Sequence, residues 1–149
     1  ARFCLRLPLS RIEPPARNPG PQDALWGRRI LVADDSRISR TLMNSVLTGA
    51  GADVDVVSDG ALALAHLDSR PYHLVILDMR MPGVDGYEVL RRIAEDPKSP
   101  PVLAVTAMAS AEDRAKILGL GAQHMLVKPV AIPELVSVAS ALLRSAALP

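Results

Sequence analysis

Residues 75–86 read VILDMRMPGVDG and decide how the rest of the chain can be organised. An apolar run leads to one carboxylate, Asp78, and Pro82-Gly83 predicts a turn soon after it. The run before Asp78, HLVIL at residues 73–77, shows no alternation of polar and apolar residues. A short continuous apolar run is typical of a strand buried on both faces of a parallel sheet. We therefore expect Asp78 to stand at the carboxyl end of a central strand.

The same pattern recurs along the chain, because short apolar runs alternate with segments of helical spacing. Strands are predicted at residues 28–33, 52–57, 73–77, 101–107 and 122–127, and helices at 36–47, 60–67, 87–94, 111–120 and from 133 onward. Strands that alternate with helices predict an α/β fold, a parallel sheet with helices on both faces. In such sheets the functional crevice lies beyond the carboxyl ends of the strands.

Composition narrows the function classes. The 149 residues suffice for one ordinary domain, and a formal net charge of +1 without a basic run argues against a nucleic-acid binder. A single cysteine, Cys4, excludes an internal disulfide and a thiolate zinc cluster, which favours a reducing cytoplasm. No run approaches the roughly 20 apolar residues that span a bilayer. We expect no membrane segment in this piece, although an anchor upstream of Ala1 is compatible with that compartment.

Polar residues follow four of the predicted strands. They are Asp34 and Asp35, Asp78, Thr106 and Lys128. Three clustered carboxylates repel one another unless a cation joins them, and oxygen ligands suit Mg²⁺, which shares its shell with phosphate. A carboxylate can also act as a nucleophile and form an aspartyl phosphate, while a lysine and a hydroxyl can bind phosphoryl oxygens. The pattern indicates phosphoryl transfer, which needs little beyond positioning and charge neutralisation.

Four motifs then make the chain resemble a known family. LVADDS, VILDMRMPGVDG, AVTA and LVKP, at residues 31–36, 75–86, 104–107 and 126–129, occur in order and in register. Across residues 28–145 the chain resembles the receiver domain of two-component response regulators. The resemblance implies a flavodoxin-like, doubly wound sheet of five parallel strands in the order 2-1-3-4-5.

The resemblance also implies a role for each acidic residue. Asp78 would be the phosphoacceptor, in a domain that later loses its phosphoryl group by self-catalysed hydrolysis. Asp35 would be the principal direct Mg²⁺ ligand together with Asp78, and Asp34 would support the ion through water. The backbone carbonyl of Arg80 would complete the protein's share of the ligands.

The remaining implied roles fall on the last two strands. Thr106 and Lys128 would hold the phosphoryl group, and the peptide bond from Lys128 to Pro129 is typically cis in this family. Receivers usually carry Phe or Tyr at the position of Met125, where the ring moves inward on phosphorylation. Met125 therefore predicts a weak or altered switch. The side chains of Arg80 and Met108 flank the approach of water to the phosphoryl group.

The first 27 residues predict the context of the domain. Residues 1–9 resemble the last strand of a histidine-kinase ATP-binding domain, residues 10–27 are a proline-rich linker, and residues 28–149 form the receiver. This order is that of a hybrid histidine kinase with a C-terminal receiver. The phosphohistidine donor would be its own kinase module or another kinase, and a histidine phosphotransfer protein is a possible acceptor. None of the three histidines is expected to be catalytic.

Three alternatives stay open. The domain is compatible with a stand-alone response regulator that carries an output domain. A haloacid-dehalogenase-type phosphatase also uses an aspartate nucleophile after a strand, but it requires a second acid at the position of Arg80. A degenerate receiver that serves only as a binding module would lack one of the acids, and none is missing.

Overall fold

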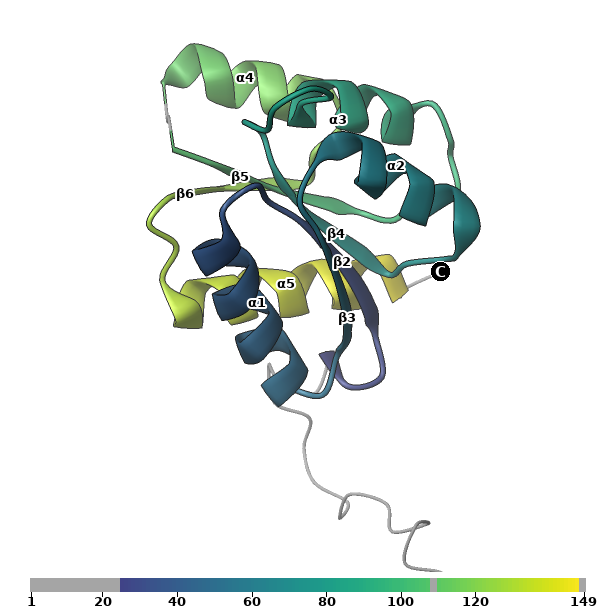
Figure 1. Ribbon diagram of the computed structural model, residues 1–149, viewed down its shortest axis with the longest axis vertical. Helices are drawn as coiled ribbons and strands as arrows, with labels where there is room; N and C mark the ends of the chain where they lie inside the picture. Colours follow the sequence, from purple (N-terminus) through teal and green to yellow (C-terminus); the bar gives the residue numbers. More distant parts are fainter. Residues whose placement is uncertain (1–24, 108–109, 148–149) are drawn as a thin grey trace, which may run out of the picture.

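The computed structural model describes residues 25–107 and 110–147, which fold into a three-layer α/β domain (Figure 1). The strands are β2 (Arg29–Ala33), β3 (Asp53–Val57), β4 (Leu74–Asp78), β5 (Val102–Thr106) and β6 (His124–Val127). The helices are α1 (Arg37–Gly49), α2 (Gly60–Ser69), α3 (Gly86–Ala94), α4 (Ala111–Gly119) and α5 (Ile132–Ala147). Each predicted strand and helix is present, and no bound differs from the predicted one by more than two residues.

All strand pairs in the sheet are parallel, and the spatial order is β3-β2-β4-β5-β6. Counted along the described chain this is 2-1-3-4-5, which confirms the doubly wound order that the family resemblance implied. Helices α1 and α5 cover one face, while α2, α3 and α4 cover the other (Figure 1). None of the described helices is both long and apolar enough to cross a membrane.

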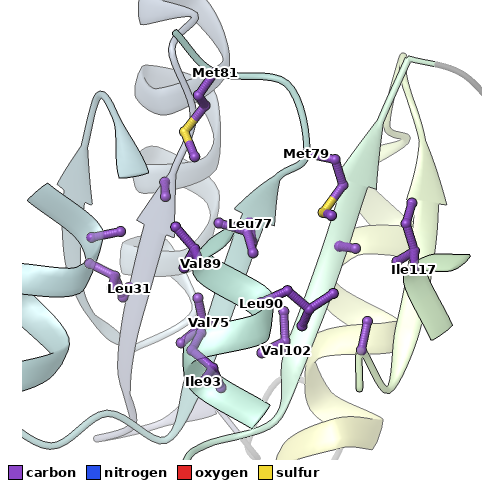
Figure 2. Close-up of a cluster of buried hydrophobic side chains, with 14 of the residues drawn as sticks. Leu31, Val75, Leu77, Met79, Met81, Val89, Leu90, Ile93, Val102 and Ile117 are labelled. Carbon is purple, nitrogen blue, oxygen red and sulfur yellow. The ribbon is translucent and has the colours of Figure 1, made fainter. Parts of the chain in front are cut away.

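The apolar runs in the sequence become strands because both faces of the sheet are covered. Every residue of β4 and of β5 is buried. Successive side chains of a strand point to opposite faces, so Leu77 packs in one core and Ile76 in the other. Figure 2 shows the first core, where Leu77 lies with Val89 and Leu90 of α3.

Four helices begin at a polar cap. The side chains of Ser36, Asp59, Asp85 and Ser110 accept hydrogen bonds from backbone N–H groups in the first turns of α1 to α4. These bonds satisfy donors that a helix start leaves without a partner. Asp85 therefore caps the start of α3, directly after the turn that follows Asp78.

Helix α3 approaches the end of β4 very closely. A Cβ atom on Gly86 would lie 2.5 Å from the carbonyl oxygen of Asp78 and 2.5 Å from the Cα of Met79. Only glycine fits this contact. The backbone N–H of Gly86 also donates a hydrogen bond to the carbonyl oxygen of Met79 at 3.3 Å. The turn after Asp78 is thus held against α3.

The packed domain begins earlier than the sequence indicated. Leu25, within the segment assigned to the linker, is fully buried in the core beneath α1 and α5. The next residues are fixed too, because the amide of Gly27 donates to the carbonyl of Gly51 at 2.9 Å. The last residues of the segment assigned to the linker, from Leu25 to Gly27, thus pack against the domain. Residues 1–24, including Cys4 and the predicted kinase strand, lie outside the described residues.

Candidate functional site

Three aspartates meet at the carboxyl ends of two adjacent strands. Asp34 and Asp35 follow β2, and Asp78 is the last residue of β4. Because Ala33 pairs with Leu77 in the β2–β4 register, the acids come directly after neighbouring positions. One carboxylate oxygen from each of the three lies within 4.8 Å of the others. Asp34 and Asp78 are buried whereas Asp35 is exposed, so the cluster opens to solvent on one side.

The positive charge that balances these acids comes from Lys128, which follows the edge strand β6. Its Nζ lies 3.1 Å from Asp34 Oδ2 and 3.3 Å from Asp78 Oδ2. The lysine follows β6, and its backbone N–H donates to the carbonyl of Thr106 at 2.8 Å, which anchors the loop on β5. The Lys128–Pro129 peptide bond is cis, as the family resemblance implied.

The carboxylate of Asp34 is held rigidly but is not fully satisfied. Its Oδ1 accepts a hydrogen bond from the backbone N–H of Ser36 at 2.8 Å. Its Oδ2 is buried and makes no hydrogen bond. The ammonium of Lys128, 3.1 Å away, balances its negative charge. A buried oxygen left this way within a three-carboxylate cluster fits the oxygen-ligand preference of a hard cation such as Mg²⁺.

The cluster changes the protonation of Asp78. Burial raises the pKa of its carboxyl group to about 6, and the negative charge of Asp34 acts in the same direction. The backbone N–H of Arg80, which donates to Asp78 Oδ1 at 3.0 Å, and the charge of Lys128 both oppose this rise in pKa. At neutral pH most of Asp78 is therefore ionised.

Lys128 stays a cation in this setting. Burial lowers the pKa of its ammonium, but the nearby carboxylates of Asp34 and Asp78 outweigh burial and raise this pKa overall. The site thus pairs a fixed positive charge with carboxylates that remain in excess of it. Such an excess attracts a further cation.

The other residues singled out from the sequence are placed as follows. Thr106 ends β5 and is buried, one position beyond the residue that pairs with Asp78. Arg80 is exposed, and its backbone N–H donates to Asp78 Oδ1 at 3.0 Å. Met125 is buried on β6 in the same core as Leu77. Met108 lies outside the described residues.

Sequence reasoning missed two residues that shape the site. Gly86 permits the close contact between α3 and the end of β4. Arg40 of α1 donates from Nη1 to the carbonyl oxygen of Asp34 at 2.7 Å. An arginine one turn after a helix cap is common on exposed helix surfaces, so neither its type nor its spacing predicted this contact.

A hollow among the described residues lies away from the acids. It measures about 490 Å³ and is lined by Leu67, Tyr72 and Ile93, among others. These residues lie near the C-terminal ends of α2 and α3 and just before β4, at the end of the strands opposite the acids. None of the three clustered aspartates lines this hollow.

Comparison with known proteins agrees with this geometry. The profile of the response regulator receiver domain matches residues 30–140. The transcriptional regulatory protein TcrA of Mycobacterium tuberculosis is 39% identical over 123 residues, which cover 83% of this chain and 49% of TcrA. The sensor protein EvgS of Escherichia coli O157:H7 is 40% identical over 103 residues, 69% of this chain and 9% of EvgS. The chain thus spans about half of the regulator and a small part of the sensor.

Solved structures give the same picture. The receiver domain of a signal transduction histidine kinase from Syntrophus aciditrophicus superposes with a TM-score of 0.76 at 26% identity, covering 83% of this chain and 95% of that one. The receiver domain of the Pseudomonas aeruginosa sensor histidine kinase PA1611 gives a TM-score of 0.73 at 29% identity, with 79% and 98% covered. That structure holds a magnesium ion in its active-site cleft.

Proposed function

The chain belongs to the response regulator receiver domain family, and on this premise we propose that Asp78 is the residue that accepts the phosphoryl group. The observation that carries the proposal is the cluster of Asp34, Asp35 and Asp78 with Lys128 bridging two of them. Asp78 is the central acid of this set because it ends the middle strand of the sheet. Its largely ionised state at neutral pH supports a nucleophilic role.

The reaction is an exchange of two bonds to phosphorus. A carboxylate oxygen of Asp78 attacks the phosphorus of a phosphohistidine, and an O–P bond forms as the N–P bond breaks. The imidazole nitrogen keeps the electron pair and takes up a proton from solvent. The Lys128 ammonium and the Thr106 hydroxyl would donate to the phosphoryl oxygens, since Lys128 Nζ lies 3.3 Å from Asp78 Oδ2 and Thr106 ends β5, the strand next to β4.

We propose Mg²⁺ as the resident metal. Asp35 and Asp78 would bind it directly, Asp34 through water, and the Arg80 backbone carbonyl would add a neutral oxygen. The exposed position of Asp35 and the buried, unsatisfied oxygen of Asp34 support this division. When bound, the ion supplies neutralisation of the charge on the phosphoryl oxygens during transfer.

The partner of this site would be a protein that presents a phosphohistidine. Ile38 and Leu42 on α1 support this, because they are 81% and 44% exposed on the helix that follows the acidic loop. Exposed apolar side chains of this kind can contact a helix that carries the donor histidine. A histidine phosphotransfer protein would use the same surface to receive the group. We place these exchanges in the cytoplasm.

We further propose that the domain is the C-terminal receiver of a hybrid histidine kinase, whose kinase module would be the donor. The match to the sensor protein EvgS and the kinase-like pattern of residues 1–9 support this context. A response regulator with its own output domain is the alternative, and the match to TcrA favours it. The sequence upstream of Ala1 decides between them: an ATP-binding domain there supports the hybrid kinase.

Incubation with acetyl phosphate and Mg²⁺, followed by intact-protein mass spectrometry, tests the proposal. We expect the gain of one phosphoryl group, its loss in Asp78→Asn, and its retention in Asp68→Asn, an exposed aspartate on α2. Equal labelling of the Asp78→Asn variant would contradict the proposal. Continuous turnover of phosphate esters would favour the phosphatase alternative instead.

A further inference from the structure

The main chain of Asp34 is fixed on both sides. Its N–H donates to the carbonyl of Val57 on β3 at 3.1 Å, and its carbonyl oxygen accepts a hydrogen bond from Arg40 Nη1 at 2.7 Å. Asp34 is fully buried. Because the carbonyl belongs to the peptide group that leads into Asp35, these bonds set the direction in which the chain presents Asp35. The hydrogen bond from Ser36 N–H to Asp34 Oδ1 spans the same peptide group, and the guanidinium adds a second constraint on it.

Arg40 reaches this carbonyl because of its place on α1. Its own amide donates to the Ser36 carbonyl at 3.0 Å, so it lies one turn into the helix. Side chains on a helix point toward its amino terminus, which directs the guanidinium back to the loop. The Ser36 hydroxyl caps the same helix by accepting from Ser39 N at 3.3 Å, which fixes the direction in which α1 starts. Cap and guanidinium together hold the loop.

We propose that Arg40 is a positioning residue for the metal site and orients Asp35 for Mg²⁺ without touching the ion or the phosphoryl group. This inference rests on the proposed function. Arg40 has two opposite effects on Mg²⁺ affinity, one through its charge and one through its hydrogen bond. The positive charge of Arg40 near three carboxylates opposes the binding of a second cation. Its hydrogen bond to the Asp34 carbonyl favours binding because it preorganises a ligand.

A Mg²⁺ titration by isothermal calorimetry distinguishes the two effects. Arg40→Gln removes both the charge and the hydrogen bond, whereas Arg37→Gln removes a charge from an exposed position on the same helix. We expect Arg40→Gln to bind Mg²⁺ at least threefold more weakly than the unmodified domain, and Arg37→Gln to bind equally or more tightly. Arg40→Lys keeps the positive charge but replaces the planar guanidinium fork with an ammonium. We expect its Mg²⁺ affinity to lie between those of Arg40→Gln and the unmodified domain.

A second measurement does not depend on how the variants fold. In the metal-free, unmodified protein, the guanidinium protons of Arg40 should exchange slowly with water and give a resolved resonance in ¹⁵N NMR spectra, while those of Arg37 should not. If the folded Arg40→Gln variant binds Mg²⁺ as tightly as Arg37→Gln, or if the Arg40 guanidinium exchanges freely, the positioning role is wrong. Lack of Mg²⁺ binding by the unmodified domain would instead contradict the proposed function, and the NMR measurement would still test the hydrogen bond.

Discussion

At the scale of single residues, the site contains buried acidic groups that lower the stability of the metal-free domain. Asp78 is buried beside Asp34, and its pKa is raised to about 6 from 3.8. Asp34 is fully buried with one oxygen that has no hydrogen bond. Both features destabilise the metal-free fold and both are relieved by a cation. Strain of this kind is expected where a protein prepares a ligand site.

The first prediction concerns pH. Because the pKa of Asp78 is higher in the folded state than in the unfolded state, the folded domain binds this proton more tightly. Its contribution to stability is therefore fully present below about pH 4 and is lost as the pH rises through about 6. Asp78→Asn removes the titration. Without metal it should be more stable than the unmodified domain by roughly 2 kcal/mol at pH 7.5, and by much less at pH 4.

Urea unfolding in the presence of a chelator, at several pH values, measures this difference. An Asp78→Asn variant that is destabilised at neutral pH, or a difference that does not vary with pH, would contradict this assignment of the raised pKa. Asp68→Asn provides the control, since Asp68 is exposed and should give no pH-dependent difference.

The second prediction concerns Lys128. Lys128→Met removes the ammonium that lies 3.1 Å from Asp34 and 3.3 Å from Asp78, and it leaves buried negative charge without a counter-ion. We expect a loss of about 1–3 kcal/mol in metal-free stability. Mg²⁺ should then raise the melting temperature of this variant by more than it raises that of the unmodified domain. An equal or smaller rise would show that the ion does not sit among these carboxylates.

At the scale of elements, the approach of α3 to the end of β4 fixes the loop that carries Arg80. This contact depends on Gly86, where a Cβ atom would lie 2.5 Å from backbone atoms that cannot move easily. The cap at Asp85 starts α3 at the same place by accepting a hydrogen bond from Glu88 N at 3.0 Å. The loop after Asp78 is therefore held by backbone packing and not only by its own turn.

Gly86→Ala tests this contact. The added methyl group must push α3 away from β4, and we expect a loss of roughly 2 kcal/mol or more in the free energy of unfolding together with weaker Mg²⁺ binding. Gly119→Ala is the matched control, because a Cβ atom there meets no atom within 4 Å and alanine favours the helix. Chemical denaturation and a metal titration of both variants provide the measurement. Equal behaviour of the two variants would rule out the close contact as a determinant of the site.

At the scale of the whole molecule, the sequence predicted the architecture well because its apolar runs are buried on both faces. It also predicted the acids, Thr106 and Lys128 at the strand ends, since parallel strands end at one edge of the sheet. It did not predict the burial of Leu25, where tertiary packing outweighs local composition, or the reach of Arg40 to Asp34. Contacts between a side chain and a backbone carbonyl leave no periodic pattern in a sequence.

The conformational response to phosphorylation also involves the whole domain. Met125 lies buried on β6, where the family usually has an aromatic ring, and methionine can repack without a large movement. We therefore predict that a phosphoryl mimic produces only small amide shift changes on the face formed by α4, β6 and α5, measured by NMR with Mg²⁺ present. Met125→Tyr should enlarge them. Large changes across that face in the unmodified domain would show that switching does not need the aromatic ring.

The most direct test of the central claim is to locate the phosphoryl group itself. The domain is phosphorylated with acetyl phosphate and Mg²⁺, the acyl phosphate is reduced with borohydride, and the modified residue is identified by peptide mass spectrometry. Reduction turns a phosphorylated aspartate into homoserine, and we predict this change at position 78 alone. Modification of Asp34 or Asp35 instead, or of no aspartate under conditions that keep the domain folded, would contradict the account.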